Sequence, residues 1–567
     1  MLRRIARRPI AVLIGIGILL HIPGLISPYW LDDFVHAAMV RGTFPSPRGP
    51  FDLYNFVSDA DRKLLVDRGV LPWWTHPHLT IRFFRPLSSL IRWTELRLGH
   101  HPLLEHVHSL AWWIAAVLAA RALYRRWLSP RATILATAIF ALAPCHATPV
   151  AWIANREVLI AVVFGTLGLV ASARARSEGG ARPLLLAFLF FSLAMLSGEY
   201  ALAFGGYALA SLLLERTPFE RRVFAFGAFA VPAVVTLAVR HALGYGNAGS
   251  SFYRDPFTQT ADFFSGAPRR IAELAFDGWL SVDADWVKDA EPWLLGIALV
   301  LLVVLMRVAV RPGLDALSSD ARRATRALSW GSVLALAPLV GVAPGQRLLG
   351  VVVLGIAPVV AVALDRAWFP SAEGASPRGG ILALVLAFFQ LVHAPVMTLF
   401  DGRDFHEVAV SFTSHAREIV ERTSGDPLHA KVVLARTGWQ NVIFLPFALR
   451  ADGKLPERWW VLSLTPHALL VRKGPRTVEI VVPKGRSYFP TGPNDLFRSI
   501  DDPLGAGDVV RVPGMTATVE QTGEDRAARL RFDFDDSLDS MLWVADGRNG
   551  WRDATPPMRG FGMPLDP

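Results

Sequence analysis

Apolar segments long enough to cross a lipid bilayer recur between residues 10 and 400 of this chain. A hydrocarbon core about 30 Å thick calls for roughly 20 consecutive apolar residues in a helix. Because the bilayer interior offers no water to the backbone, such segments must be helical. We therefore predict an all-α polytopic membrane region of about eleven transmembrane helices. The segments are 10–27, 105–123, 132–150, 157–173, 183–198, 200–214, 222–243, 292–310, 327–344, 347–364 and 379–400. The pair 183–198 and 200–214 is equally compatible with a short re-entrant hairpin.

The composition agrees with this prediction. Of the 567 residues, 52% are hydrophobic and only 19% are charged, against about a quarter in ordinary soluble proteins. The formal charge of +10 comes from arginines that cluster between the apolar segments, a pattern of membrane topology and not of nucleic-acid binding. Cys145 is the single cysteine, so no intramolecular disulfide can form.

The arginines also predict an orientation. Residues 3–8 hold four arginines, which places the N-terminus in the cytoplasm, and no small-residue cleavage site follows the first apolar segment. With eleven spans, every arginine-rich short loop falls on the cytoplasmic side. The segments 28–104 and 244–291 and the C-terminus then lie outside, as expected for a multi-pass protein of the bacterial inner membrane.

We predict two domains, a membrane domain over 1–400 and an extracytoplasmic domain over 401–567. The second begins with a helical pattern at 406–422 and continues with short strand-like runs separated by Gly, Pro and Asp. A small, antiparallel, β-rich (α+β) domain is expected. The runs are 431–435, 442–447, 459–464, 468–472, 477–482, 508–512 and 528–534.

Several ionisable residues gather at the predicted outer ends of the spans. Such residues are costly at a membrane and are functional hypotheses by default. The alternative is structural, since acidic residues beside a span are often solvated and an Arg–Glu pair in a loop often only stabilises it. The residues are Asp32, Asp33, Arg85, Arg156, Glu157, Glu199 and Arg347.

Carboxylates beside arginines at a bilayer surface suit glycosyl transfer from a lipid phosphate. A carboxylate can take the proton of an acceptor hydroxyl as its oxygen attacks the sugar. Arginines can bind the departing phosphate with their planar guanidinium groups and stabilise its charge.

Two further features carry less information. Residues 85–98 have leucines and an isoleucine at helical spacing after Pro86, which predicts an amphipathic helix in the outer interface with its charged residues off the apolar stripe. His106 and His108 are two residues apart and would face different sides of a helix, and no HExxH pattern occurs, so we predict no metal site from the histidines. No Walker loop or GxSxG elbow is present either.

The outer motifs, taken in order, resemble those of the polytopic glycosyltransferases of the C superfamily. The branch most similar holds the tetratricopeptide-linked mannosyltransferases and protein O-mannosyltransferase-like enzymes, although no such repeats follow here. The resemblance covers about residues 1–365 and rests on an acidic pair after the first span and five short motifs. These are Phe84-Arg85-Pro86-Leu87, the segment 100–110 that opens the second span and holds His106, the hairpin Pro144–Arg156, Leu196-Ser197-Gly198-Glu199, and Arg347 before an apolar span.

The resemblance implies an inverting hexosyl- or mannosyl-type transferase with a polyprenyl-phosphate sugar as donor and a protein or glycan acceptor. It implies Asp32 or Asp33 as general base and Arg85, Arg156 and Arg347 as phosphate-binding residues. Acceptor-binding or supporting roles would fall to His36, His106, His146, Glu157 and Glu199. Members with and without a divalent metal occur, so a metal is left open. Gly198 stands where the branch has a lysine.

Two other classes of protein remain as alternatives. One is a non-catalytic membrane scaffold for envelope assembly that keeps the fold. The other is a transporter of polyprenyl-linked glycans, which would be expected to carry broken helices and charges near mid-membrane. The charges here lie at the outer rim, which favours surface chemistry.

Overall fold

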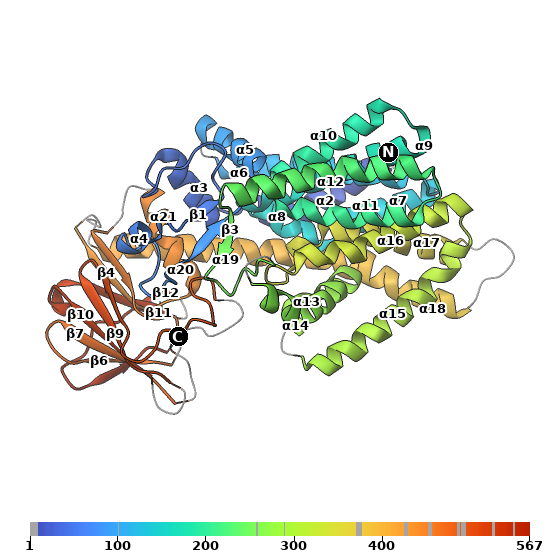
Figure 1. Cartoon of the computed structure of the whole chain (residues 1–567). Helices are drawn as coiled ribbons and strands as arrows, with labels where there is room; N and C mark the ends of the chain where they lie inside the picture. Colours follow the sequence, from blue (N-terminus) through green and yellow to red (C-terminus); the bar gives the residue numbers. More distant parts are fainter. Residues whose placement is uncertain are drawn as a thin grey trace. The chain divides into compact units, whose positions relative to one another are not determined.

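A computed structural model describes most of the chain (Figure 1). The residues outside the description are 1–8, 100, 257–258, 288–289, 370–376, 424–428, 452–455, 466, 485–487, 489–494, 524–527, 548–549 and 567. The chain divides into two compact units. The first contains residues 1–27, 83–245 and 256–407, and the second contains 28–82, 246–255 and 408–567. The segment 28–104, which is predicted to lie outside, is thus divided between the two.

The first unit is helical. Its centre is formed by α9 (Glu157–Glu178) and α17 (Gly350–Trp368), which are mostly buried inside the protein. Helices α6 and α10 pack on α9, and α7, α15 and α16 pack on α17. The other helices of the unit are α2 (Pro9–Leu25), α5 (Pro86–Leu98), α6 (Pro102–Tyr124), α7 (Pro130–Ala141), α8 (Ala147–Ala151), α10 (Ala181–Ser197), α11 (Phe204–Leu214), α12 (Phe219–Ala242), α13 (Thr260–Leu280), α14 (Ala284–Val287), α15 (Pro292–Asp315), α16 (Ser319–Leu339), α18 (Pro377–Phe388) and the first part of α19 (Ala394–Arg422), with a π-helical turn at Phe389–His393 between the last two. Residues 408–422 of α19 belong to the second unit.

Helical structure occupies each predicted span, but the number eleven is not confirmed. Six helices of the described chain are long and apolar enough to cross a membrane, or seven with the bent pair α7–α8. Helices α2 and α10 and the segment Glu199–Leu214 are apolar but shorter, and α16 begins with a charged turn. The six are Pro102–Tyr124, Ile153–Glu178, Phe219–Ala242, Pro292–Asp315, Gly350–Trp368 and Ile381–Arg422.

Two local predictions need correction. The segment 132–150 is not one straight helix, because the chain bends by 50° between α7 and the helices that begin at Pro144. Proline cannot donate the helical hydrogen bond and disfavours helix in the residue before it. Helix α5 forms as predicted after Pro86, but it buries Arg92 and leaves Leu98 exposed. Ser88, Ser89 and Leu96 are buried together with Arg92, so the buried face of α5 is mostly polar and is not the apolar stripe.

Short 3₁₀ turns join the helices where the polar residues lie. They are η1 (Pro144–His146), η2 (Ile153–Arg156), η3 (Glu199–Ala203) and η4 (Gln346–Leu348). Turn η4 packs against η1 and α8, and η3 packs against α9, α10 and α16. These contacts bring chain segments that are distant in sequence to one end of the helices.

The second unit contains three sheets. A six-stranded antiparallel sheet has the order β13-β6-β7-β10-β9-β8, and a four-stranded mixed sheet has the order β12-β11-β4-β5. A three-stranded sheet, β1-β2-β3, joins the segments 28–104 and 244–291, which are predicted to lie outside. The strands are β1 (Asn55–Val57), β2 (Thr80–Arg82), β3 (Gly246–Ala248), β4 (Lys431–Arg436), β5 (Arg458–Val461), β6 (Leu469–Arg472), β7 (Thr477–Val482), β8 (Val509–Val512), β9 (Met515–Gln521), β10 (Ala528–Phe534), β11 (Leu542–Gly547), β12 (Gly550–Asp553) and β13 (Gly562–Pro564).

The β-rich prediction is confirmed in outline and wrong in detail. The run 442–447 is helical, since α20 (Trp439–Ile443) and α21 (Leu445–Ala451) connect β4 to the parallel strand β5. Strands β4 and β11 are parallel as well, so this sheet is not antiparallel. In the larger sheet, Leu530 and Phe532 of β10 alternate inward with polar residues outward, as one buried face requires. Helices α3 (Asp32–Arg41) and α4 (Arg62–Asp67) complete the unit.

Candidate functional site

Arg85 is the centre of a group of charged residues in the first unit. Its Nη1 donates to Glu157 Oε1 at 3.0 Å, and its Nε donates to Glu199 Oε2 at 3.1 Å. The other oxygen of Glu199 accepts from the Phe84 main-chain NH at 2.8 Å and lies 3.8 Å from Arg240 Nε. Residues from α9, η3, α12 and the chain before α5 therefore meet at one point.

Arg347, on the turn η4, also belongs to this group. The guanidinium groups of Arg85 and Arg347 both act electrostatically on the Glu157 carboxylate. Tyr200, next to Glu199, fixes η4: its hydroxyl donates to Leu348 O at 3.0 Å and accepts from the Val351 NH at 2.8 Å. Through these two hydrogen bonds, Tyr200 holds Leu348, the neighbour of Arg347, in place.

The group carries more positive than negative charge. Three arginines, at 85, 240 and 347, face two glutamates, at 157 and 199, which leaves a formal charge of +1 if all are ionised. We call this set the arginine cluster. Arg347 is half-buried and Arg85 is partly exposed, so the charge is not sealed in the interior.

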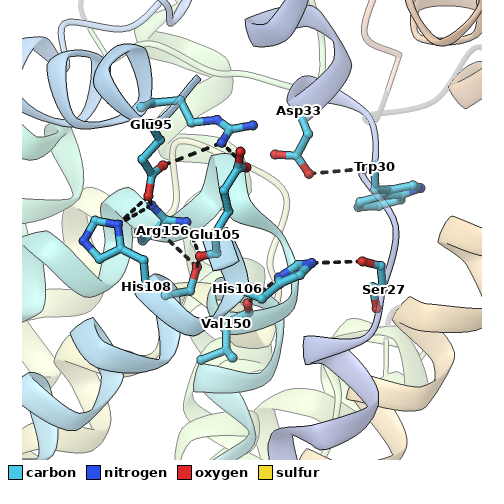
Figure 2. A network of polar contacts seen from close by, with 11 residues as sticks. Ser27, Trp30, Asp33, Glu95, Glu105, His106, His108, Val150 and Arg156 are labelled. Atoms are coloured by element: carbon cyan, nitrogen blue, oxygen red, sulfur yellow. Dashed lines mark hydrogen bonds and ion pairs between the residues drawn. The ribbon is translucent and has the colours of Figure 1, made fainter. Parts of the chain in front are cut away.

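Arg156 is held in a different network, shown in Figure 2. Its Nε donates to Ser109 Oγ at 2.8 Å, its Nη2 donates to Glu105 O at 2.6 Å, and its Nη1 pairs with Glu95. The arginine is 3% exposed. Each nitrogen of this guanidinium already has a protein acceptor, which is the arrangement of a structural residue.

Glu95 joins this network from α5. It contacts His108 and Arg156, and Arg92 Nη1 lies 3.6 Å from its Oε2 while also pairing with Glu105. Burial alone would raise the pKa of Glu95, but the His108 hydrogen bond and the two arginines lower that pKa to about 2. The polar face of α5 is thereby attached to α6 and η2.

The predicted histidines of the first unit bind main-chain oxygens. His106 places its ring nitrogens 3.1 Å from Ser27 O and 3.3 Å from Val150 O (Figure 2). His146 Nε2 lies 2.9 Å from Phe140 O, with its ring edge-on to the Phe140 ring. Both histidines connect helix ends and lie outside the arginine cluster as described by its contacts.

Asp32, Asp33 and His36 belong to the second unit, at the start of α3. Asp33 is buried and its Oδ2 accepts from the Trp30 main-chain NH at 3.1 Å (Figure 2), whereas Asp32 is half-buried. His36 packs against the rings of both Tyr54 and Phe56. Leu31, just before the acidic pair, has φ of 45°. A non-glycine residue in this region carries strain on the order of 1–3 kcal/mol, which is common at functional sites.

The sequence did not single out Asn155, Arg240 or Glu95. Arg240 had a signal, because a charged residue inside a predicted span is itself a functional hypothesis. Asn155 Nδ2 donates to Glu157 Oε1 at 3.1 Å, a contact that only the folded hairpin reveals. Within the described residues, no group of three or more His, Cys, Asp or Glu side chains could hold a metal ion.

Comparison with known proteins gave no match to a protein family and no match among curated proteins. Among solved structures, the chain is similar to ArnT from Cupriavidus metallidurans bound to undecaprenyl phosphate (TM-score 0.44, 12% identity, 78% of this chain and 85% of that chain). It is also similar to the archaeal oligosaccharyltransferase AglB from Archaeoglobus fulgidus in complex with an inhibitory peptide and a dolichol-phosphate (0.42, 11%, 79% and 64%).

A third similar structure is the mycobacterial arabinofuranosyltransferase AftD (TM-score 0.41, 16% identity, 92% of this chain). The chain spans only 40% of that protein's length. All of these TM-scores lie below 0.5, so the functional argument below rests on the residues of this chain.

Proposed function

We propose that this protein is an integral-membrane glycosyltransferase of the bacterial inner membrane. It transfers a sugar of hexosyl or mannosyl type from polyprenyl phosphate to a protein or glycan acceptor outside the cytoplasm, with inversion. The observation that carries the proposal is the arginine cluster, whose net positive charge lies where helices of an apolar bundle end. A phosphodiester anion is the complement of such a site.

The reaction follows from these groups. A hydroxyl oxygen of the acceptor attacks the anomeric carbon, the carbon–oxygen bond to phosphate breaks, and polyprenyl phosphate leaves with the electron pair. Asp32 or Asp33 takes the hydroxyl proton as the new bond forms. Arg347 and Arg85 stabilise the charge that grows on the phosphate. Attack from the face opposite the leaving group inverts the anomeric carbon.

Arg156 is assigned a positioning role in this proposal. Its donors are used by Ser109, Glu95 and the Glu105 carbonyl, so it fixes η2, the turn from which Asn155 and Glu157 extend. His106 and His146 support the same hairpin through main-chain oxygens.

Binding of undecaprenyl phosphate to the full chain in lipid nanodiscs tests the proposal. We expect Arg347→Gln to weaken binding about tenfold, because a charge-assisted contact to phosphate is removed. Arg311→Gln is the matched control, since Arg311 is an exposed arginine of α15 whose ion pair in the described chain is with Asp315. If the wild-type protein does not bind this lipid, the proposal is wrong and the scaffold alternative takes its place.

A further inference from the structure

Three side chains, one of them a member of the arginine cluster, have buried polar atoms without a hydrogen-bond partner among the described residues. They are Asn155, Glu157 and Gln346, which are 9%, 4% and 8% exposed. The atoms are Asn155 Oδ1, Glu157 Oε2, and both Oε1 and Nε2 of Gln346. A buried polar atom without a partner destabilises the fold, and native proteins keep few of them without a reason.

These atoms lie on segments that converge. Asn155 and Glu157 are joined by the 3.1 Å hydrogen bond to Glu157 Oε1, the oxygen that also accepts from Arg85. Gln346 precedes Arg347 in η4, and η4 packs against η1 and α8, the segments that lead into η2. Arg347 in turn acts on Glu157 electrostatically. Two of the three side chains are thus joined to the hydrogen bonds of the arginine cluster, and the third lies on the turn that carries Arg347.

Their chemistry differs from that of the cations. Three of the four atoms are hydrogen-bond acceptors, and one, Gln346 Nε2, is a donor. An ionised phosphodiester has only acceptor oxygens, so it can satisfy the arginines but not Asn155 Oδ1 or Glu157 Oε2. Sugar hydroxyls both donate and accept, and they match all four atoms. A sugar carboxylate would bring a second negative charge against Glu157, which is unfavourable in a buried setting.

We infer that Asn155, Glu157 and Gln346 bind the hydroxyls of a neutral sugar on the lipid donor, and that they select against a uronic acid. The inference rests on the proposed function and adds the residues that bind the sugar and the exclusion of a charged sugar. It also separates two parts of the donor: the arginines bind the phosphate, and the amides and Glu157 Oε2 bind the sugar.

The test compares two lipids on the same protein. Binding of bare undecaprenyl phosphate and of undecaprenyl-phosphate glucose is measured by native mass spectrometry, with the full chain in nanodiscs. Asn155→Ala and Gln346→Leu should each weaken binding of the glucose lipid about tenfold, the loss expected for one hydrogen bond. Both variants should bind the bare lipid within twofold of wild type. The glucuronate-linked lipid should bind wild type more weakly than the glucose lipid.

Thr166→Val is the matched control. Thr166 is fully buried on the same helix as Glu157, and its hydroxyl also has no partner among the described residues, but it lies nine positions further along α9. The Thr166→Val protein should bind both lipids as wild type does. Thermal unfolding of each variant shows whether it is folded, and Gln346→Leu serves alone if Asn155→Ala is not.

Two outcomes overturn the inference. Unchanged binding of the glucose lipid by both variants would mean that ordered water satisfies these atoms. An equal loss for both lipids would mean that the residues only support the arginines. If wild type binds neither lipid, the proposed function itself fails, which is a different result from either of these.

Discussion

The side chain of Arg85 lies across Gly198. A β-carbon at residue 198 would stand 3.4 Å from Arg85 Nε and 3.5 Å from its Cγ and Cδ. The motif that this chain resembles has a lysine at this position, and here the neighbouring space is taken by an arginine from a distant segment. Gly198 has φ of 164°, an extended conformation open to any residue, so backbone geometry does not require glycine there.

Restoring the lysine should strengthen phosphate binding. Gly198→Lys adds a cation beside the arginine cluster, and we expect it to tighten binding of undecaprenyl phosphate severalfold at low salt, with the gain falling as ionic strength rises. Gly198→Ala is the control and should leave both lipid binding and the unfolding temperature close to wild type, since the β-carbon meets only ordinary contacts. Weaker binding by Gly198→Lys would show that its charge repels Arg85 and displaces it.

Apolar length and charge alternation predict most of the helices, because a membrane allows few conformations other than a helix. The same rules do not predict the bend at Pro144. The residues on both sides of this proline are apolar, so the segment 132–150 reads as one span although the chain bends there by 50°. These rules also predict strands at 442–447 from apolar residues that are buried as a helix between two parallel strands. Short apolar runs do not distinguish these two outcomes.

The candidate site shows a similar division. The sequence predicts Arg85, Glu157, Glu199 and Arg347 on one face, at the ends of different spans, and in the fold they form one group in the first unit. Arg156 has the same sequence signal, but it forms an ion pair with Glu95 and a hydrogen bond with Ser109. Side chains and a carbonyl of α5 and α6 occupy the donors of Arg156, so this arginine has none available for a ligand. Motif spacing in the sequence does not predict these contacts.

Arg156 and Arg347 should therefore respond differently to substitution. Arg156→Met leaves Glu95 with one charged partner fewer in a buried network, and we expect a loss of about 3–5 kcal/mol in unfolding free energy. Arg347→Met should cost less than about 1 kcal/mol, because Arg347 is half-buried and is not fixed by a short ion pair among those found in the described chain. Thermal unfolding followed by tryptophan fluorescence measures both. Equal destabilisation would contradict the separation of the two roles.

The Glu95 network should make stability depend on pH in the acid range. The folded-state pKa of Glu95, about 2, lies below its ordinary value of about 4.5. Such a group stabilises the fold fully above pH about 4.5 and loses that contribution as pH falls toward 2. The unfolding temperature of wild type should fall between pH 6 and pH 3. Glu95→Gln should be less stable at pH 6, with a smaller fall. Exposed Glu407, changed to Gln, is the control. Parallel curves for wild type and Glu95→Gln would disprove the assignment.

The acidic pair at the start of α3 should be needed for chemistry more than for lipid binding. If Asp32 or Asp33 removes the acceptor proton, its change to Asn should lower the transfer rate about 100- to 10,000-fold at saturating donor. Binding of undecaprenyl phosphate should remain near wild type, since neither aspartate belongs to the arginine cluster. The measurement is the initial rate of sugar transfer from the glycosyl lipid that binds most tightly. Asp59→Asn is the control, because Asp59 is an exposed aspartate of the same unit.

The aspartate whose substitution lowers the transfer rate more is the base. The buried one, Asp33, should also lose stability as Asn, because its Oδ2 accepts from the Trp30 main chain. Full transfer by both variants would remove the base from this pair and, with it, the mechanism proposed above.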